Sequence, residues 1–159
     1  MRYASIRSFD VSNGEGIGVA LFTQGCKFHC KNCFNQETWD LDGGKLWTSL
    51  TEDKVIGLLN RPGISRLSIL GGEPLLDRNI EELVHLFKRV KKVYGNDITI
   101  WLYSGYTYEV ITKQFPDIIA NIDVLVDGLY VEELRDLNLY FRGSSNQRVI
   151  NVKTGELMY

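Results

Sequence analysis

The chain has 159 residues, of which 44% are hydrophobic and 24% are charged, and its formal net charge is −2. This size and composition suit one globular domain that spans residues 1–159. The charge balance lacks the basic surplus of nucleic-acid-binding proteins, and the longest apolar runs are too short to cross a bilayer, so neither nucleic acid nor a membrane is expected as a partner. No secretory signal is visible and the cysteines are clustered, which favours the cytoplasm.

Strand-like and helix-like segments alternate along the chain. Apolar and β-branched runs predict strands, and apolar residues at helical spacing predict helices with polar caps. In chain order we expect a strand at 17–24, a helix at 51–60 capped by Thr51, a strand at 66–70, a helix at 78–94 capped by Asp77, a strand at 97–103, a helix at 107–115 that ends near Pro116, and a strand at 122–127. From Arg142 to Tyr159 the pattern is less regular, with a turn at 153–155.

This alternation favours an α/β fold with a parallel sheet, because buried parallel strands read as near-continuous apolar runs. A complete eight-fold barrel takes about 250 residues. The chain is too short for that, so we expect a partial, open (β/α) barrel, with a flat doubly wound sheet as the alternative. In both folds, ligands bind at the carboxyl ends of the strands.

Unusual residues follow each of the four expected strands. Cys26 to Cys33 follow the first strand, Gly71-Gly72-Glu73-Pro74 the second, Ser104-Gly105 the third and Asp127-Gly128 the fourth. Because the carboxyl ends of parallel strands lie at one edge of a sheet, these loops should meet. We therefore expect one binding site at that edge.

All three cysteines, Cys26, Cys30 and Cys33, form a C-x3-C-x2-C pattern. Three thiolates can hold three irons of a 4Fe–4S cube and leave the fourth open to a small molecule. A structural zinc site would need a fourth ligand, for which His29 is available, and this alternative stays open. A disulfide framework does not fit an odd number of cysteines, and a lone cysteine nucleophile would not need three.

The Gly-Gly-Glu-Pro turn, residues 71–74, suggests contact between backbone and ligand. Two glycines let a polar ligand approach the main chain, and Glu73 offers an acceptor for an ammonium group. An ordinary strand-to-helix turn would have similar composition. The cysteine pattern at the end of the preceding strand makes the ligand-binding interpretation the stronger one.

Together these motifs resemble the radical S-adenosylmethionine enzymes. The segment VSNGEGIGVALFTQGCKFHCKNCFNQETWD is similar to the N-terminal signature of the activases of glycyl-radical enzymes. Within that family, FRGSSNQRVI, residues 141–150, is similar to a segment of the branch that activates anaerobic ribonucleoside-triphosphate reductase. The resemblance covers nearly the whole chain, with its strongest motifs at 13–39, 70–75 and 141–150.

The resemblance implies a reaction and a set of site residues. Reductive cleavage of S-adenosylmethionine would give a 5′-deoxyadenosyl radical, which takes a hydrogen atom from a glycine of the reductase's large subunit. An external one-electron donor such as a flavodoxin would reduce the cluster. The implied cluster ligands are Cys26, Cys30 and Cys33; Gly71, Gly72 and Glu73 would hold the amino group of S-adenosylmethionine, and the backbone around Asn32, Cys33 and Phe34 would lie near its adenine.

Some positions depart from the family pattern. The loop before the first expected strand usually reads N-G-P-G-x-R in the family, but here Glu15 stands in place of the proline and Gly18 in place of the arginine. The aromatic residue often found before the last cysteine is absent, since Asn32 stands there and Phe34 follows instead. The second of these differences is shared with the reductase-activating branch.

Three questions stay open from the sequence. Ser104 could donate a hydrogen bond to a ribose hydroxyl or serve only as a turn residue. The segment 141–150 could dock the reductase, close the open side of the barrel or complete the sheet as a strand. Two other functions remain as alternatives: a short radical S-adenosylmethionine enzyme that acts on a small molecule in deazapurine synthesis, and a small zinc-binding interaction domain.

Overall fold

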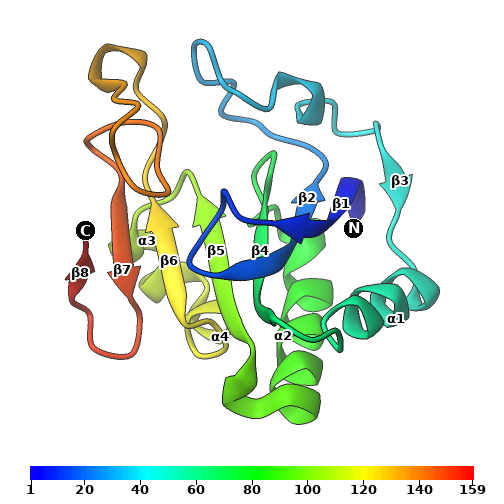
Figure 1. Cartoon of the computed structure of the whole chain (residues 1–159). Coiled ribbons are helices and arrows are strands. Elements are labelled where there is room, and N and C mark those ends of the chain that lie inside the picture. The colour runs from blue at the N-terminus through cyan, green and yellow to red at the C-terminus, as the bar shows by residue number, and fades with distance from the viewer.

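A computed structural model describes all residues, 1–159, and shows a mixed α/β fold built on one eight-stranded sheet (Figure 1). The order of strands across the sheet is β3-β1-β2-β4-β5-β6-β7-β8. The strands are β1 Arg2–Asp10, β2 Ile17–Thr23, β3 Lys45–Leu46, β4 Ile64–Gly71, β5 Thr99–Ser104, β6 Val124–Asp127, β7 Arg148–Asn151 and β8 Leu157–Met158. The helices are α1 Ser49–Leu58, α2 Ile80–Tyr94, α3 Tyr108–Gln114 and α4 Pro116–Ile119.

The four predicted strands form the centre of the sheet, and the prediction that they run parallel is confirmed. Strands β2, β4, β5 and β6 are neighbours in that order, and each pair is parallel. The flanking strands β1, β3, β7 and β8 pair antiparallel. Strands β1, β3 and β8 were not predicted, whereas a strand within segment 141–150 was one of the open interpretations. The sheet is therefore mixed, with a parallel centre that brings four strand ends to one edge.

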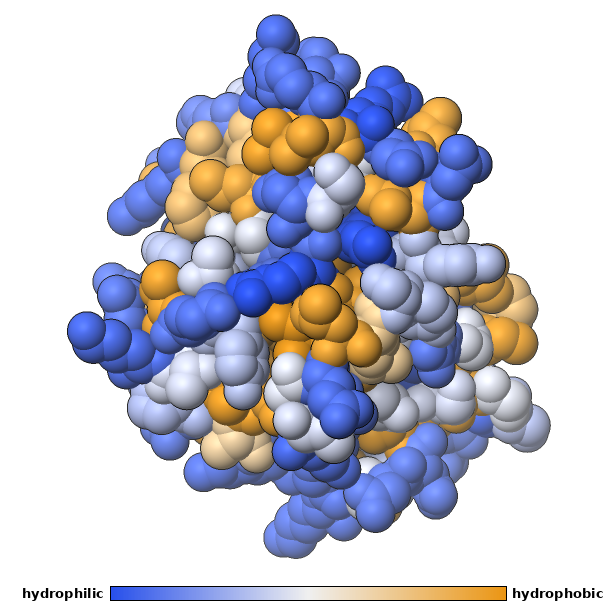
Figure 2. Space-filling view, turned by 90° about the vertical axis from the view of Figure 1, so that its left-hand side faces the viewer, coloured by the Kyte–Doolittle hydropathy of each residue, from blue (hydrophilic) through white to orange (hydrophobic).

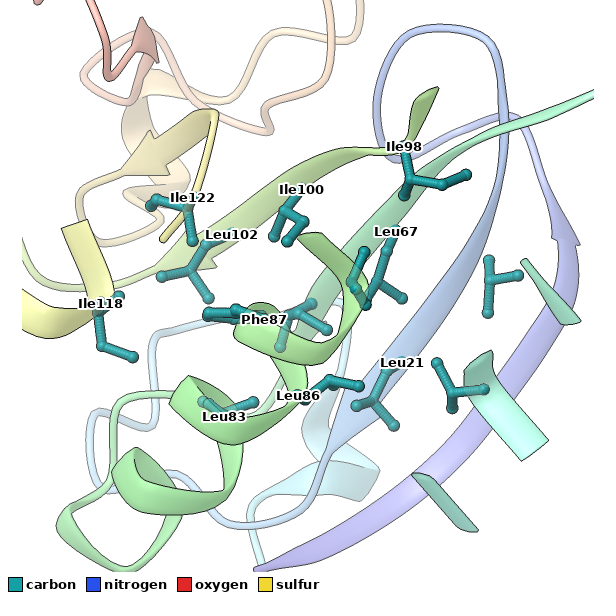
Figure 3. Close-up of a cluster of buried hydrophobic side chains, with 14 of the residues drawn as sticks. Leu21, Leu67, Leu83, Leu86, Phe87, Ile98, Ile100, Leu102, Ile118 and Ile122 are labelled. Atoms are coloured by element: carbon teal, nitrogen blue, oxygen red, sulfur yellow. The ribbon is translucent and has the colours of Figure 1, made fainter. Parts of the chain in front are cut away.

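All four helices cover the same face of the sheet, because each contributes to one hydrophobic core. In this core, Leu83, Leu86 and Phe87 of α2 meet strand residues such as Leu67 and Leu102 (Figure 3). A doubly wound sheet would carry helices on both faces, so that alternative does not fit. None of the helices combines the length and the apolar character that a membrane-spanning segment needs.

The opposite face of the sheet carries no helix. Its buried side chains come from alternate strand positions and form two small clusters around Trp101 and Phe22. Trp101 and Tyr103 lie on this face, while their neighbours Ile100 and Leu102 belong to the core under the helices. Alternate side chains of each strand thus point to a face that no helix covers, and this face has room for a cavity.

The predicted helix boundaries were wrong at two N-termini. Helix α1 begins at Ser49, and its N-cap is Thr48, whose hydroxyl accepts a hydrogen bond from the Thr51 amide; Thr51 itself lies inside the helix. Asp77 was expected to cap α2 but lies in a short 3-10 turn, Asp77–Asn79, and makes no capping bond. Pro116 ends the preceding helix as predicted and starts α4, where its missing amide hydrogen has no cost.

The C-terminal segment is more regular than the sequence indicates. Strand β7 pairs antiparallel with β6, and its residues Val149 and Ile150 are buried. A tight turn at residues 152–154, near the predicted one, joins it to β8. Of the three interpretations of segment 141–150, completion of the sheet therefore holds for residues 148–150.

Ending the chain after Arg142 should leave it insoluble or unfolded. The truncation exposes the edge of β6 and removes Val149 and Ile150, whose burial contributes roughly 1.5–3 kcal/mol each. That loss is comparable with the 5–15 kcal/mol, roughly, that separates folded from unfolded domains. Soluble yield and circular dichroism check this, with truncation after Asn151, which removes β8 and the turn before it but keeps β7, as the control. A soluble, folded product of the shorter chain would contradict the structural role of β7.

Candidate functional site

Loops that follow the four parallel strands meet at one edge of the sheet, as predicted (Figure 1). They enclose a cavity of about 140 Å³ with lining residues from all four loops. The predicted site residues that line it are Cys26, Cys30, Cys33, Gly71, Gly72, Glu73 and Ser104. Phe34 lines an adjoining larger cavity instead, and Asn32 lines neither of the two.

The cysteine loop follows β2, and hydrogen bonds join the residues at its two ends. The Gly25 amide donates to the carbonyl of Thr38 over 2.7 Å, and the Cys26 amide donates to the carbonyl of Trp39 over 3.2 Å. The side-chain amide of Gln24 donates to the carbonyl of Asp40 over 2.9 Å. The two ends of the loop are thus tied together, and the cysteines lie between them.

The three thiols are free and partly exposed. Burial raises the pKa of Cys26 and Cys30. No three His, Cys, Asp or Glu side chains converge as the ligands of a single metal ion would. Thiolates at separate corners of an iron–sulfur cube do not need to touch one another, so the donor set fits a cluster held by three cysteines.

His29 was the possible fourth ligand of a zinc site. Its ring stacks on the indole of Trp39, with the ring centroids 4.4 Å apart and the planes 4° from parallel. The backbone of His29 has a positive φ of 49°. The imidazole therefore packs on Trp39, which gives no support to the zinc alternative.

The Gly-Gly-Glu turn is hydrogen-bonded to the start of the cysteine loop. The Gly72 amide donates to the Thr23 carbonyl over 3.0 Å, and the Glu73 amide donates to the Gly25 carbonyl over 2.9 Å. A Cβ atom added to Gly72 would lie 2.2 Å from the Gly25 carbonyl oxygen, and Gly71 has a φ of +115°. Both glycines are therefore required by close backbone contact between the two loops.

The Glu73 carboxylate is buried and accepts three hydrogen bonds within the protein. Its Oε1 accepts from the Leu75 amide over 3.0 Å and from the Ser104 hydroxyl over 2.8 Å, and its Oε2 accepts from the Gly105 amide over 2.7 Å. The Ser104 oxygen also accepts from the Tyr106 amide. Through these contacts Ser104 holds Glu73, and the carboxylate joins the loops after β4 and β5.

Replacing Glu73 by glutamine should change how stability depends on pH. Burial raises the pKa of Glu73 to about 7 from an ordinary value of 4.5. The folded state therefore binds this proton more tightly than the unfolded chain, and the resulting stability, complete below about pH 4.5, is lost as the pH rises through about 7. The free energy of unfolding of the wild type relative to Glu73→Gln should fall by on the order of 3 kcal/mol across that window.

Denaturant unfolding of the cluster-free protein at the two ends of this window measures the difference. The glutamine variant also loses the bond from the Gly105 amide, but that cost is the same at both pH values. A difference between the two proteins that does not change with pH would show that Glu73 does not titrate in this range.

A larger cavity of about 560 Å³ adjoins the first one. The two cavities share the lining residues Cys33, Asn35, Leu70, Tyr103, Tyr130 and Gln147. Tyr103, Tyr130 and Gln147 were not predicted. Alternation along β5 places Tyr103 on the helix-free face of the sheet, and this pattern could have identified it. Tyr130 and Gln147 belong to the connection between β6 and β7, which no pattern in the strands identifies.

That connection, residues 129–147, lies over the cysteine loop. The Phe34 ring lies 5.3 Å from the Tyr130 ring, and the guanidinium of Arg135 lies 5.7 Å from the Phe34 centroid. Asn32 has a positive φ of 55°, a conformation that asparagine tolerates. Phe34 thus contacts the connection, and neither Asn32 nor Phe34 lines the smaller cavity.

The Arg-Gly-Ser-Ser-Asn-Gln stretch, residues 142–147, holds this connection in place. The Gln147 side chain accepts from the amides of Gly143 and Ser144 and donates to the Gly128 carbonyl over 3.0 Å. The Asn146 side-chain amide donates to the Leu129 carbonyl over 2.7 Å. Residues 142–147 of segment 141–150 therefore fix the conformation of the connection by hydrogen bonds beside the larger cavity.

Exposed apolar side chains lie on the connection, including Leu134, Leu137 and Tyr140. Leu137 is 79% exposed and lines the larger cavity. On the side of the molecule that carries β7 and β8, hydrophobic side chains gather in several patches among hydrophilic ones (Figure 2). The rim of the larger cavity is thus partly apolar.

Comparison with known proteins gives consistent matches over most of the chain. The family described as 4Fe-4S single cluster domain matches residues 12–150. A Vibrio cholerae protein is 40% identical over 149 residues, which cover 92% of this chain and 96% of that protein. An Escherichia coli K12 protein is 35% identical over 156 residues (96% and 100%), and one from Enterobacteria phage T4 is 38% identical over 149 residues (94% and 93%). All three relatives are named anaerobic ribonucleoside-triphosphate reductase-activating protein.

Proposed function

This chain belongs to the family of anaerobic ribonucleoside-triphosphate reductase-activating proteins, which carry a 4Fe-4S single cluster domain, and we propose that it generates a glycyl radical on that reductase. The observation that carries the proposal is the meeting of two loops. The three free cysteines and the Gly-Gly-Glu turn come from different strands, yet they line one cavity at the carboxyl edge of the parallel strands. Cluster ligands and a backbone surface for a polar co-substrate are thus side by side.

Cys26, Cys30 and Cys33 would hold the 4Fe-4S cluster through their thiolates. When bound, a cluster with one open iron supplies the electron that cleaves S-adenosylmethionine into methionine and a 5′-deoxyadenosyl radical. The chain has no fourth cysteine to close the site. Because it has no cysteines for a second cluster either, the electron must come from an external donor such as a flavodoxin, for which the exposed Lys27 and Lys31 offer positive charge beside the cluster loop.

The backbone of Gly71 and Gly72 would hold the amino end of S-adenosylmethionine. Glu73 supports this surface indirectly, because its carboxylate is occupied by Leu75, Ser104 and Gly105 and fixes the loops on either side. Ser104 acts through Glu73 rather than on the ribose. The backbone near Cys33 and Phe34 lies at the border of the two cavities, a suitable place for adenine.

The fold suits an activase that acts on another protein. One face of the sheet is free of helices and carries the larger cavity, and in a partial (β/α) barrel of the radical S-adenosylmethionine type this face would be the open side. A segment of the reductase could enter there and bring a glycine to the edge of the smaller cavity. We assign this activity to a single domain that spans residues 1–159. The named relatives favour this function over deazapurine synthesis or a zinc-binding domain.

Isotope transfer tests the proposal. The reductase is prepared with deuterium on the Cα atoms of its glycines and is mixed anaerobically with the cluster-loaded protein, S-adenosylmethionine and a reductant. Deuterium should appear in the 5′-deoxyadenosine that forms, and mass spectrometry detects it. Omission of the reductase is the control. Deuterium-free 5′-deoxyadenosine at full turnover would contradict hydrogen abstraction from the reductase.

A further inference from the structure

The helix-free face of the sheet contains one fully buried arginine, Arg66 of β4, to which the proposed reaction assigns no role. Its guanidinium lies 3.0 Å from the buried carboxylate of Asp10. It also donates to the carbonyls of Asp10, Asn13 and Glu15 over 2.7, 3.2 and 3.1 Å, and to the Ser68 hydroxyl over 2.6 Å. A buried guanidinium is tolerated only when its charge is paired and its donors are satisfied, and here both conditions are met.

The three carbonyls belong to residues 10–16, which run from the last residue of β1 to the start of β2. Two further hydrogen bonds hold the same segment. The Ser68 hydroxyl donates to the Asn13 carbonyl over 2.6 Å, and the Asn13 side-chain amide donates to the Asp10 carboxylate over 2.9 Å. Arg66 is thus the centre of a polar network that determines the conformation of segment 10–16.

Gly18 of β2 makes room for this arginine. It is the direct register partner of Arg66 in the β2–β4 ladder. A Cβ atom at Gly18 would lie 2.5 Å from the Arg66 carbonyl oxygen and 2.9 Å from the guanidinium carbon. Arg66 can therefore occupy this position only because residue 18 has no side chain.

Segment 10–16 forms part of the wall of the larger cavity. Ser12 and Asn13 line that cavity together with Phe34, Phe141 and Arg142, whereas no residue of the segment lines the smaller cavity beside the cysteines. A change in the segment should therefore alter what happens in the larger cavity and leave the cluster site unaffected.

We propose that Arg66 is a positioning residue for radical transfer: it holds Ser12 and Asn13 as the wall against which the glycine-bearing segment of the reductase lies. This inference rests on the proposed function. Hydrogen abstraction depends steeply on the distance and orientation of the reacting atoms, so a loose wall should lower the transfer to glycine more than the cleavage of S-adenosylmethionine.

The test compares Arg66→Lys with the wild type, both cluster-loaded and anaerobic. Lysine keeps the charge beside Asp10 but lacks the fork of donors that reaches the carbonyls. Hydrogen exchange at the amides of residues 11–16 should become about tenfold faster or more. Binding and cleavage of S-adenosylmethionine should stay within about twofold, while glycyl radical formed per 5′-deoxyadenosine should fall about tenfold.

Three other variants complete the experiment. Gly18→Ala should displace the guanidinium and reproduce both effects, and Ser68→Ala should produce smaller effects in the same direction. Arg89→Lys is the matched control, because Arg89 pairs with Glu52 and Asp53 on the helix-covered side and should change neither quantity.

The proposal is overturned if Arg66→Lys resembles Arg89→Lys in exchange and in radical yield, or if it loses S-adenosylmethionine binding as steeply as radical yield. If Arg66→Lys does not fold, Ser68→Ala decides by the same two measurements. Failure of the proposed function is distinguishable, because the wild type itself would then form no glycyl radical.

Discussion

Changing Cys26, Cys30 or Cys33 to alanine should abolish the iron–sulfur cluster and all cleavage of S-adenosylmethionine. Each variant leaves only two thiolates, and alanine offers no ligand for iron. The fold should survive, because none of the three cysteines belongs to a hydrophobic core cluster. Iron and sulfide content, visible absorption and 5′-deoxyadenosine production measure the loss, and circular dichroism measures the fold.

His29→Ala is the matched control within the same loop. The His29 ring stacks on Trp39, so its loss should leave the cluster content near that of the wild type. A zinc site with His29 as a ligand would give the opposite result. Full iron content and activity in any one of the cysteine variants would remove that cysteine from the ligand set.

Replacing Gly72 by valine should cost both the cluster and S-adenosylmethionine binding. The sequence alone suggests that such a variant would keep its cluster and lose only co-substrate binding. The structure changes that expectation, because a Cβ atom at Gly72 would lie 2.2 Å from the Gly25 carbonyl oxygen and 2.8 Å from the Thr38 carbonyl oxygen. Both atoms belong to the base of the cysteine loop, and backbone cannot yield as a flexible side chain does, so the loop must move.

Iron content and the spectral response to S-adenosylmethionine should therefore decline together, each by about tenfold or more if the displaced loop costs roughly 1.4 kcal/mol or more. Gly57→Val is the control, since a Cβ atom at Gly57 of α1 meets nothing within 4 Å. A Gly72→Val protein with a full cluster would show that the contact with Gly25 can relax without disturbing the cysteines.

The parallel centre of the fold and the location of the site could be predicted from the sequence. Near-continuous apolar runs such as Val19 to Phe22 have few alternatives to a buried strand, and glycines and cysteines mark their carboxyl ends. Antiparallel β1 was missed, and β7 was only one of three interpretations of its segment, for physical reasons. Most residues of β1 are exposed or half-buried, and β7 has four residues, so neither shows a clear hydrophobic pattern.

The contacts within the site depend on residues far apart in the chain. Ser104 reads equally well as a ribose ligand or a turn residue until the carboxylate of Glu73, 31 positions earlier, is placed against it. Arg66 reads as a polar start to a buried strand, and only the register with Gly18 and the fold of segment 10–16 place it in the interior. Sequence patterns identify the loops that meet, whereas the partners of each polar group follow from the tertiary structure.

Electron paramagnetic resonance tests the central claim most directly. The cluster-loaded protein is mixed anaerobically with S-adenosylmethionine, a one-electron reductant and the anaerobic reductase, and the frozen sample is examined for an organic radical. Our account predicts a glycyl radical signal on the reductase that is split by the glycine Cα hydrogen and is absent with the Cys30→Ala variant. If S-adenosylmethionine is cleaved but no glycyl radical appears on the reductase, the chain is not the activase that we propose.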